Sequence, residues 1–153
     1  MEIVKDFSTL IGVLIALWGF YRGFSEFILQ GKQKRAEMFL KKQGEYFENA
    51  SFNEIRGLLE TDDLKLQDIG FEEKRAYLTF FEEIAVLKNS RLINGNLTYY
   101  MFGYYATRCL ESKNFWLNIN KDNIFWHVFL HFAADMQYRL RSNNEVVKYK
   151  IEF

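Results

Sequence analysis

The chain has 153 residues, of which 49% are hydrophobic and 18% aromatic, and it contains no proline. Its 20 basic and 20 acidic residues cancel, so no global field argues for nucleic acid as a direct partner. The single cysteine, Cys109, excludes an internal disulfide and agrees with a reducing compartment.

The first predicted element is a membrane-spanning helix near the amino terminus. Residues 7–21 (FSTLIGVLIALWGFY) carry no charge, and apolar side chains resume after Arg22 and Gly23. Residues 7–29 would form a helix of about 34 Å, enough to cross a hydrocarbon core of about 30 Å. A secretory signal peptide and a buried core helix are the alternatives. The acidic amino-terminal flank argues against the first, and the length and the basic cluster that follows argue against the second.

Small residues form a stripe along this predicted helix. At about 100° per residue they fall within an arc of about 80°, and bulkier apolar side chains lie on the opposite side, toward lipid. Such a stripe lets two helix backbones approach closely. Because each chain has one span, the partner helix must come from another copy, and we expect a homo-oligomer in the lipid bilayer. The stripe consists of Ser8, Gly12, Ala16, Gly19 and Gly23.

Three polar residues mark the end of the predicted span. Glu26 and Gln30 continue the stripe, and Arg22 lies one turn before Glu26, with which it can pair. Polar groups at membrane depth are tolerated only against protein or water. We therefore expect this face to be an interface or the lumen of a pore.

A basic cluster after the span predicts its orientation. By the positive-inside rule, the rest of the chain lies in the cytoplasm and the amino terminus lies outside. The same cluster is also suited to anionic lipid or RNA, but a topology signal is the leading interpretation. Its residues are Lys32, Lys34, Arg35, Lys41 and Lys42.

The chain divides into residues 1–31 (the span and its flank), residues 32–142 (one helical domain) and a tail at 143–153. Helices are expected at 38–49, 71–89, 97–111 and 121–142, and the capping-box pattern Ser51-x-x-Glu54 predicts a short helix between the first two. A turn is expected at 94–96, and the tail reads as a short strand or a disordered end. The predicted fold class is all-α: a single transmembrane helix followed by a small cytosolic helical bundle.

A stretch within this domain resembles a known family. Residues 77–112 (YLTFFEEIAVLKNSRLINGNLTYYMFGYYATRCLES) resemble a widespread bacterial family of membrane-anchored helical proteins with no assigned activity, through the landmarks FFEE, LI and FGYY. Within this group the chain is similar to the small membrane accessory proteins of type VI-B CRISPR systems. That resemblance implies a HEPN-like fold, the bacterial inner membrane, and an oligomeric pore. It also implies antiphage defence alongside an RNA-guided effector.

The ribonuclease motif of HEPN-like folds, an Arg followed shortly by a His, is absent from this sequence. The nearest match is Arg108 with Asn114, and an Asn side chain cannot carry out acid–base catalysis. Glu82 and Glu83 are candidate catalytic carboxylates, but on a helix only one of them would point inward, and a salt-bridged Glu at the edge of the core, paired with Arg75 or Arg108, is the leading expectation. No catalytic set is found, so we expect no enzyme and no cofactor.

Three potential metal ligands follow one another at intervals of one helical turn: His127, His131 and Asp135. A zinc site would need a further ligand from another helix, and no HExxH-type base accompanies them. We therefore expect this face to meet a neighbouring subunit, a vestibule or solvent rather than a metal. The opposite face is predicted to enter the core through Phe125, Phe129, Phe132 and Met136.

Two functions from different classes remain. In the first, several copies assemble through the stripe into a pore. In the second, the span is only an anchor, and the helical domain is an adaptor or sensor that docks a cytosolic partner. The pore is the leading expectation.

Overall fold

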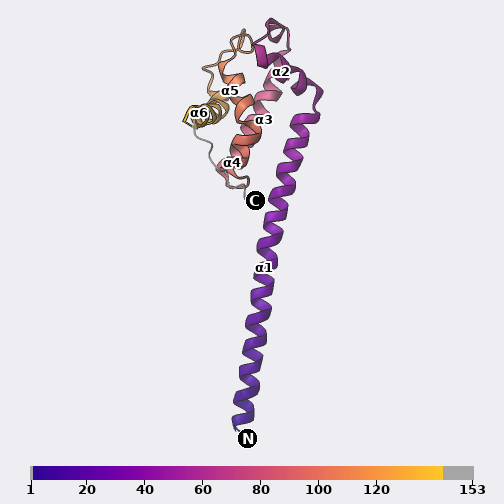
Figure 1. The fold of residues 1–153 in the computed structure, drawn as a ribbon, viewed down its shortest axis with the longest axis vertical. Helices are drawn as coiled ribbons and strands as arrows, with labels where there is room; N and C mark the ends of the chain where they lie inside the picture. The colour runs from indigo at the N-terminus through magenta and orange to yellow at the C-terminus, as the bar shows by residue number, and fades with distance from the viewer. Residues whose placement is uncertain (1, 143–153) are drawn as a thin grey trace.

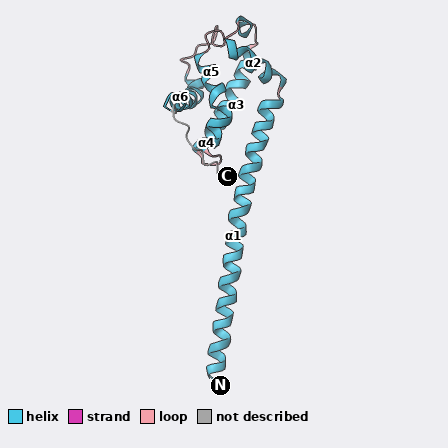
Figure 2. Cartoon of the chain, in the orientation of Figure 1, coloured by secondary structure: helices cyan, strands magenta, loops and turns pink. Residues whose placement is uncertain are grey.

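The computed structural model describes residues 2–142, with side chains from residue 12 onward, and its regular structure is helical throughout (Figures 1 and 2). Over these residues there is no strand, which confirms the predicted all-α class with a long amino-terminal helix. The tail at 143–153 lies outside the described residues. In chain order the elements are α1 (Glu2–Glu48), α2 (Ala50–Thr61), η1 (Leu64–Gln67), α3 (Phe71–Asn89), α4 (Gly95–Thr98), η2 (Tyr99–Gly103), α5 (Tyr104–Glu111), η3 (Ile124–Trp126) and α6 (His127–Ser142).

Helix α1 is continuous over 47 residues and is therefore about 70 Å long. Its amino-terminal half extends away from the bundle in Figure 1, and its last turns pack against the other helices. Phe39 is nearly buried and Tyr46 is fully buried in the core. The boundary after residue 31 falls inside this helix, so the predicted span continues into the bundle without a loop.

Helix α2 begins differently from the prediction. The side chain of Asn49 accepts a hydrogen bond from the Phe52 N–H and caps the helix, so the predicted capping box of Ser51 and Glu54 is wrong. Ser51 lies inside the first turn, and its hydroxyl donates to the Glu73 carboxylate of α3. Asn and Ser have similar preferences for the N-cap position. Because the Ser51 hydroxyl is engaged with α3, Asn49 caps the helix instead.

Residues 95–111 form one helical segment that contains a π-helical turn. Asn94 caps its start by accepting from the N–H groups of Asn96 and Leu97, so the predicted turn at 94–96 is in fact the first turn of a helix. The π turn, η2, spans Tyr99–Gly103. A Cβ atom added at Gly103 would lie 3.0 Å from the Tyr99 ring and 3.5 Å from the Met136 sulfur. Glycine at this position therefore lets the η2–α5 segment and α6 pack closely.

Helix α6 begins at His127, six residues later than predicted, because the chain forms a 3-10 turn first. Asn123 caps that turn by accepting from the Phe125 N–H. The expectation that Phe125 enters the core is wrong, since its side chain is 76% exposed. Phe129, Phe132 and Met136 are buried as predicted.

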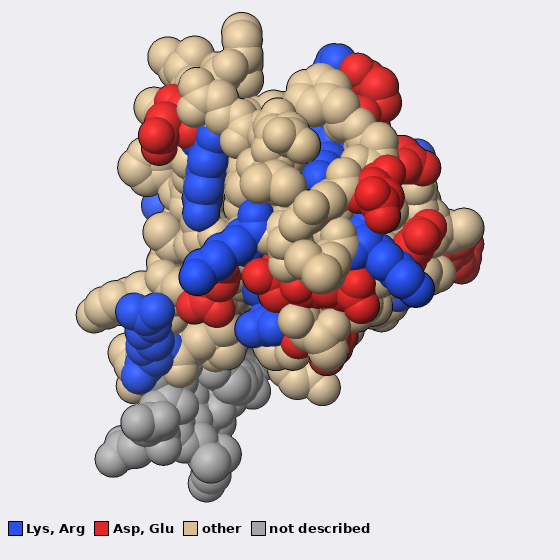
Figure 3. Space-filling view, turned by 90° about the horizontal axis from the view of Figure 1, so that it is seen from above, with Lys and Arg blue, Asp and Glu red and all other residues tan. Residues whose placement is uncertain are grey.

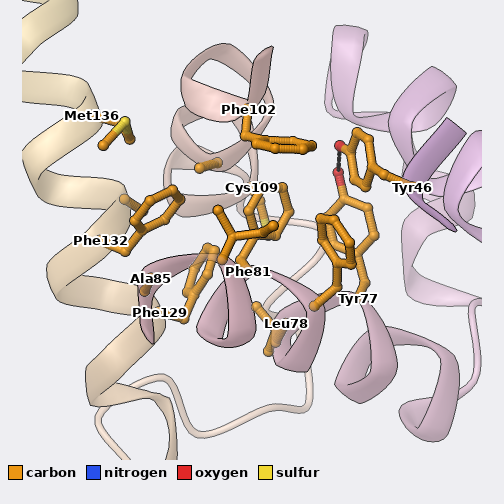
Figure 4. Packing of buried hydrophobic residues seen from close by; sticks show 14 of the residues in the cluster. Tyr46, Tyr77, Leu78, Phe81, Ala85, Phe102, Cys109, Phe129, Phe132 and Met136 are labelled. Atoms are coloured by element: carbon orange, nitrogen blue, oxygen red, sulfur yellow. Dashed lines mark hydrogen bonds between the residues drawn. The ribbon is translucent and has the colours of Figure 1, made fainter. Parts of the chain in front are cut away.

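Aromatic rings dominate the core that joins α1 to the bundle (Figure 4). The Tyr46 ring stacks on Phe80 with centroids 5.0 Å apart and meets Phe102 edge-on at 5.5 Å. Such ring pairs add stability beyond the area they bury. Cys109 is fully buried beside them, and burial raises the pKa of its thiol well above the ordinary value.

Candidate membrane helix and associated polar sites

The amino-terminal half of α1 presents an apolar surface that the bundle leaves uncovered. It is the one helix among the described residues that is long and apolar enough to cross a membrane. From Val13 to Leu29, large apolar side chains are 44% to 75% exposed. A patch this large and continuous is typical of a membrane or protein contact.

The small-residue stripe on this half of α1 has no packing role within the described chain. A Cβ atom added at Gly12, Gly19 or Gly23 would meet nothing within 4 Å. Each glycine costs about 1 kcal/mol relative to alanine in a helix interior. Ala16 lies on the same face and is exposed, whereas the Ser8 side chain lies outside the described ones. The bundle therefore gives no reason for these glycines.

The polar residues at the end of the span are all exposed. The Arg22 guanidinium lies 5.3 Å from the centre of the Trp18 ring, a cation–π contact. No ion pair joins Arg22 to Glu26 within residues 12–142, where the sequence allows one. Glu26 and Gln30 continue the face of the stripe and are free to meet another chain or water.

The stripe and the bundle lie on opposite faces of α1. Tyr46 follows Gly19 by 27 residues, which is about 180° around the helix axis at 100° per residue. Phe39 follows Gly23 by 16 residues, or about 160°. A second copy that packs on the stripe would therefore meet no obstruction from the bundle of the first.

Arg108 and Asn114 hold the carboxyl end of α2. Arg108 donates to the carbonyls of Leu59 and Glu60, at 3.1 and 2.6 Å. The Asn114 side chain donates to the carbonyl of Asp62, and its backbone N–H donates to the Asp62 carboxylate at 3.2 Å. Both side chains therefore act as anchors between α2 and the segment after α5.

One of the adjacent glutamates on α3, Glu83, is salt-bridged as predicted, but its partner differs from the prediction. Glu83 pairs with Lys42 of α1 at 2.7 Å, whereas Arg75 pairs with Glu72 at 3.4 Å. Glu82 is half-buried, and one of its carboxylate oxygens is buried with no hydrogen-bond partner among the described residues. Burial raises the pKa of Glu82, although the backbone N–H of Phe129 works in the opposite direction. The predicted pairing with Arg75 or Arg108 is therefore wrong.

His127 and His131 are exposed on α6, with ring centroids 6.5 Å apart. Asp135 is half-buried and accepts from Lys88 at 2.7 Å and from Arg139 at 3.4 Å. Burial would raise the pKa of Asp135, but these two cations outweigh it and lower the pKa. The carboxylate is thus occupied by cations, and the two imidazoles face outward beside a surface pocket.

One feature that the sequence pattern did not single out is a basic pocket between α1 and the turn after α3. Arg35 and Arg91 both line it, although 55 residues separate them in the chain. The Arg91 backbone has a positive φ of 57°, which no composition or spacing rule predicts at an arginine. In the sequence, Arg35 belongs to the basic cluster interpreted as a topology signal. In the structure, its side chain also lines this pocket.

Comparisons with protein-family models, with curated proteins and with solved structures find no match for this chain. Over residues 2–142, the fold and its exposed apolar helix define a class: a helical protein with one candidate membrane-spanning segment joined directly to a bundle.

Proposed function

We propose that the protein is an integral membrane protein that assembles through the small-residue stripe of α1 into a pore. The observation that carries this proposal is the exposed apolar half of α1, whose glycines contact nothing in their own chain. Close approach of helix backbones is the use that membrane helices make of such stripes. The position of the bundle on the opposite face of α1 supports the proposal, because it leaves the stripe accessible along the whole span.

A pore built from one helix per chain needs a ring of helices. With helices about 10 Å in diameter, a ring of about six leaves an opening about one helix wide. Glu26 and Gln30 would face the neighbouring chain or this opening, with Arg22 beside them, and would set its charge at the cytosolic end. The bundles would lie on the outside of the ring.

The setting we propose is the bacterial inner membrane, with the amino terminus outside and the bundle in the cytoplasm. The basic residues after the span support this orientation. The similarity to the CRISPR accessory proteins, in length, single amino-terminal span and helical cytosolic domain, supports a role in antiphage defence beside an RNA-guided effector. We propose no catalytic role for Arg108 and Asn114, which are engaged in anchoring α2.

Dye release from liposomes tests the pore. The purified full-length chain is reconstituted, and release is compared for wild type, for Gly12→Leu with Gly19→Leu, and for the matched control Leu17→Phe on the lipid-facing side. We expect release from wild type and the control, and none from the glycine variant. Equal release from all three proteins would refute the role of the stripe, and no release from wild type would refute the pore.

The alternative is a membrane-anchored adaptor or sensor without pore activity. The observation in its favour is the unbroken α1, which holds the bundle at a fixed distance from the membrane. Replacing residues 7–29 with an unrelated spanning helix separates the two functions. An adaptor keeps its function in cells after this replacement, and a pore loses it.

A further inference from the structure

A surface pocket of the bundle opens between α1 and the turn that links α3 to α4. Its volume is about 600 Å³, within the range of small-molecule sites. Its walls combine charged and apolar side chains from two segments far apart in the sequence. The lining includes Arg35 and Phe39 of α1, Lys88 of α3, and Arg91 and Leu92 of the turn.

The charge of this pocket is positive. Lys88 is neutralised by Asp135 at 2.7 Å. Within residues 12–142, the side chains of Arg35 and Arg91 have no ion pair or hydrogen bond, and no acidic residue lines the pocket. A guanidinium group presents paired donors that match the oxygens of a phosphate group. Two unpaired arginines around one cavity therefore favour a phosphate-bearing ligand.

The position of the pocket relative to the span indicates whether its ligand is a lipid phosphate or a free phosphate. Arg35 follows Leu29, the last residue of the predicted span, by six residues, or about 9 Å along α1. A lipid headgroup layer is about 5 to 8 Å thick on each side of the hydrocarbon core, and an arginine side chain extends toward it. Figure 1 shows α4 at the end of the bundle nearest the exposed half of α1. Arg35 therefore lies just beyond the headgroup layer, close enough for its side chain to reach a lipid phosphate, and Leu92 of the same pocket is partly exposed.

The end of the bundle away from the span differs in charge from the positively charged pocket near the span. Figure 3, viewed from the end of the bundle away from the span, shows basic and acidic side chains interspersed. The cavity near the span, by contrast, combines two unpaired arginines with an apolar wall. This contrast favours a ligand that belongs to the membrane over one that arrives from the cytosol.

We propose that this pocket binds the phosphate group of an anionic phospholipid in the leaflet that faces the bundle, with Arg35 and Arg91 as its two guanidinium ligands. The proposal rests on the membrane insertion of α1 in the proposed function, but not on the pore. The bound lipid would fix the bundle against the membrane surface, since the pocket has one wall on α1 and the other on the bundle.

Thermal unfolding of the full-length chain in neutral detergent, with added phosphatidylglycerol or phosphatidylcholine, tests this proposal. At lipid concentrations about 100-fold above Kd, we expect phosphatidylglycerol to raise the Tm by about 5 to 10 °C. Phosphatidylcholine should not raise it. The double variant Arg35→Gln with Arg91→Gln should lose the response. The control Arg75→Gln should keep it, because Arg75 is exposed and lies outside the pocket.

Three results would overturn the proposal. One is equal stabilisation by both lipids, and another is a full response in the double variant. The third is an equal response to sn-glycerol 3-phosphate, which would assign the pocket to free phosphates. The double variant must show the wild-type circular dichroism spectrum and the wild-type Tm without lipid, so that loss of response does not reflect misfolding.

Carbonate washing of membranes separates this proposal from the proposed function. If wild type washes off, membrane insertion fails and the lipid site fails with it. If wild type stays in the membrane but shows no lipid preference, the lipid site alone fails. If the double variant still releases dye from liposomes, the lipid site and the pore are independent.

Discussion

The hydroxyl of Tyr46, in the last turns of α1, shares a hydrogen bond of 2.8 Å with the hydroxyl of Tyr77 on α3 (Figure 4). Both side chains are fully buried. Burial raises the pKa of both phenols above the ordinary value, so both stay neutral at physiological pH. This bond joins the helix that carries the membrane span to the centre of the bundle.

A double-mutant cycle at Tyr46 and Tyr77 tests this connection. Replacing either tyrosine with phenylalanine leaves the other hydroxyl buried without its partner, and we expect each single variant to lose about 1 to 3 kcal/mol of unfolding free energy. The double variant should lose less than the sum of the two, because no hydroxyl is left unpaired. Denaturant unfolding in detergent measures these values. Additive losses would show that the two hydroxyls do not interact.

The junction between α2 and the segment after α5 depends on Asp62. Its carboxylate accepts from the Ser112 hydroxyl and from the backbone N–H groups of Lys113 and Asn114. Its backbone has a φ of 52°, a conformation that Asn tolerates better than Ala. We expect Asp62→Asn to cost about 1 to 3 kcal/mol, and Asp62→Ala to cost about 1 kcal/mol more. Equal costs would contradict the backbone part of this explanation.

The same junction makes stability depend on pH. Burial would raise the pKa of Asp62, but the hydrogen bonds and the charge of Arg108 outweigh it and lower the pKa. A lowered pKa contributes stability above the ordinary value of about 4, and this contribution is lost as the pH falls through the folded-state pKa. We expect the stability difference between wild type and Asp62→Asn to shrink below about pH 4. Unfolding at several pH values measures it, and a constant difference would contradict the assignment.

Two glycines in helical segments should respond oppositely to alanine. At Gly57 in α2, an added Cβ meets nothing within 4 Å, so Gly57→Ala should stabilise by about 0.5 to 1 kcal/mol. At Gly103, the same atom lies 3.0 Å from the Tyr99 ring, and overpacking of about 1 to 3 kcal/mol outweighs the gain in helix propensity. Thermal unfolding compares the two variants. Stabilisation by Gly103→Ala would show that the Tyr99 ring moves aside at little cost.

Local patterns predicted what depends on local physics. The apolar periodicity of α1, α3 and α5 indicates helices, because the face of each helix repeats at short intervals in the sequence. The starts of helices depend on tertiary contacts and were harder to predict. Ser51 fits a capping pattern, but its hydroxyl contacts Glu73, and Asn49 caps α2 instead. Phe125 fits the apolar face of α6, but the 3-10 turn before that helix rotates it into solvent.

Among the polar sites too, features that depend on local spacing could be predicted, and features that depend on tertiary contacts could not. The stripe from Gly12 to Gly23 follows from spacing alone, and the structure adds that it faces away from the bundle. The pairing of Glu83 with Lys42 and the anchoring of α2 by Arg108 join residues more than 40 positions apart. The pocket of Arg35 and Arg91 depends on such a juxtaposition and on one left-handed backbone position. Sequence periodicity predicts neither the juxtaposition of distant residues nor the left-handed backbone position.

The mass of the detergent-solubilised complex, by light scattering corrected for bound detergent, tests the central claim most directly. For a chain of 18.4 kDa, a ring of about six copies has a protein mass of about 110 kDa. We expect that mass or a larger one for wild type and Leu17→Phe, and a smaller one for Gly12→Leu with Gly19→Leu. A wild-type monomer or dimer would contradict the pore, because so few single helices cannot enclose a passage.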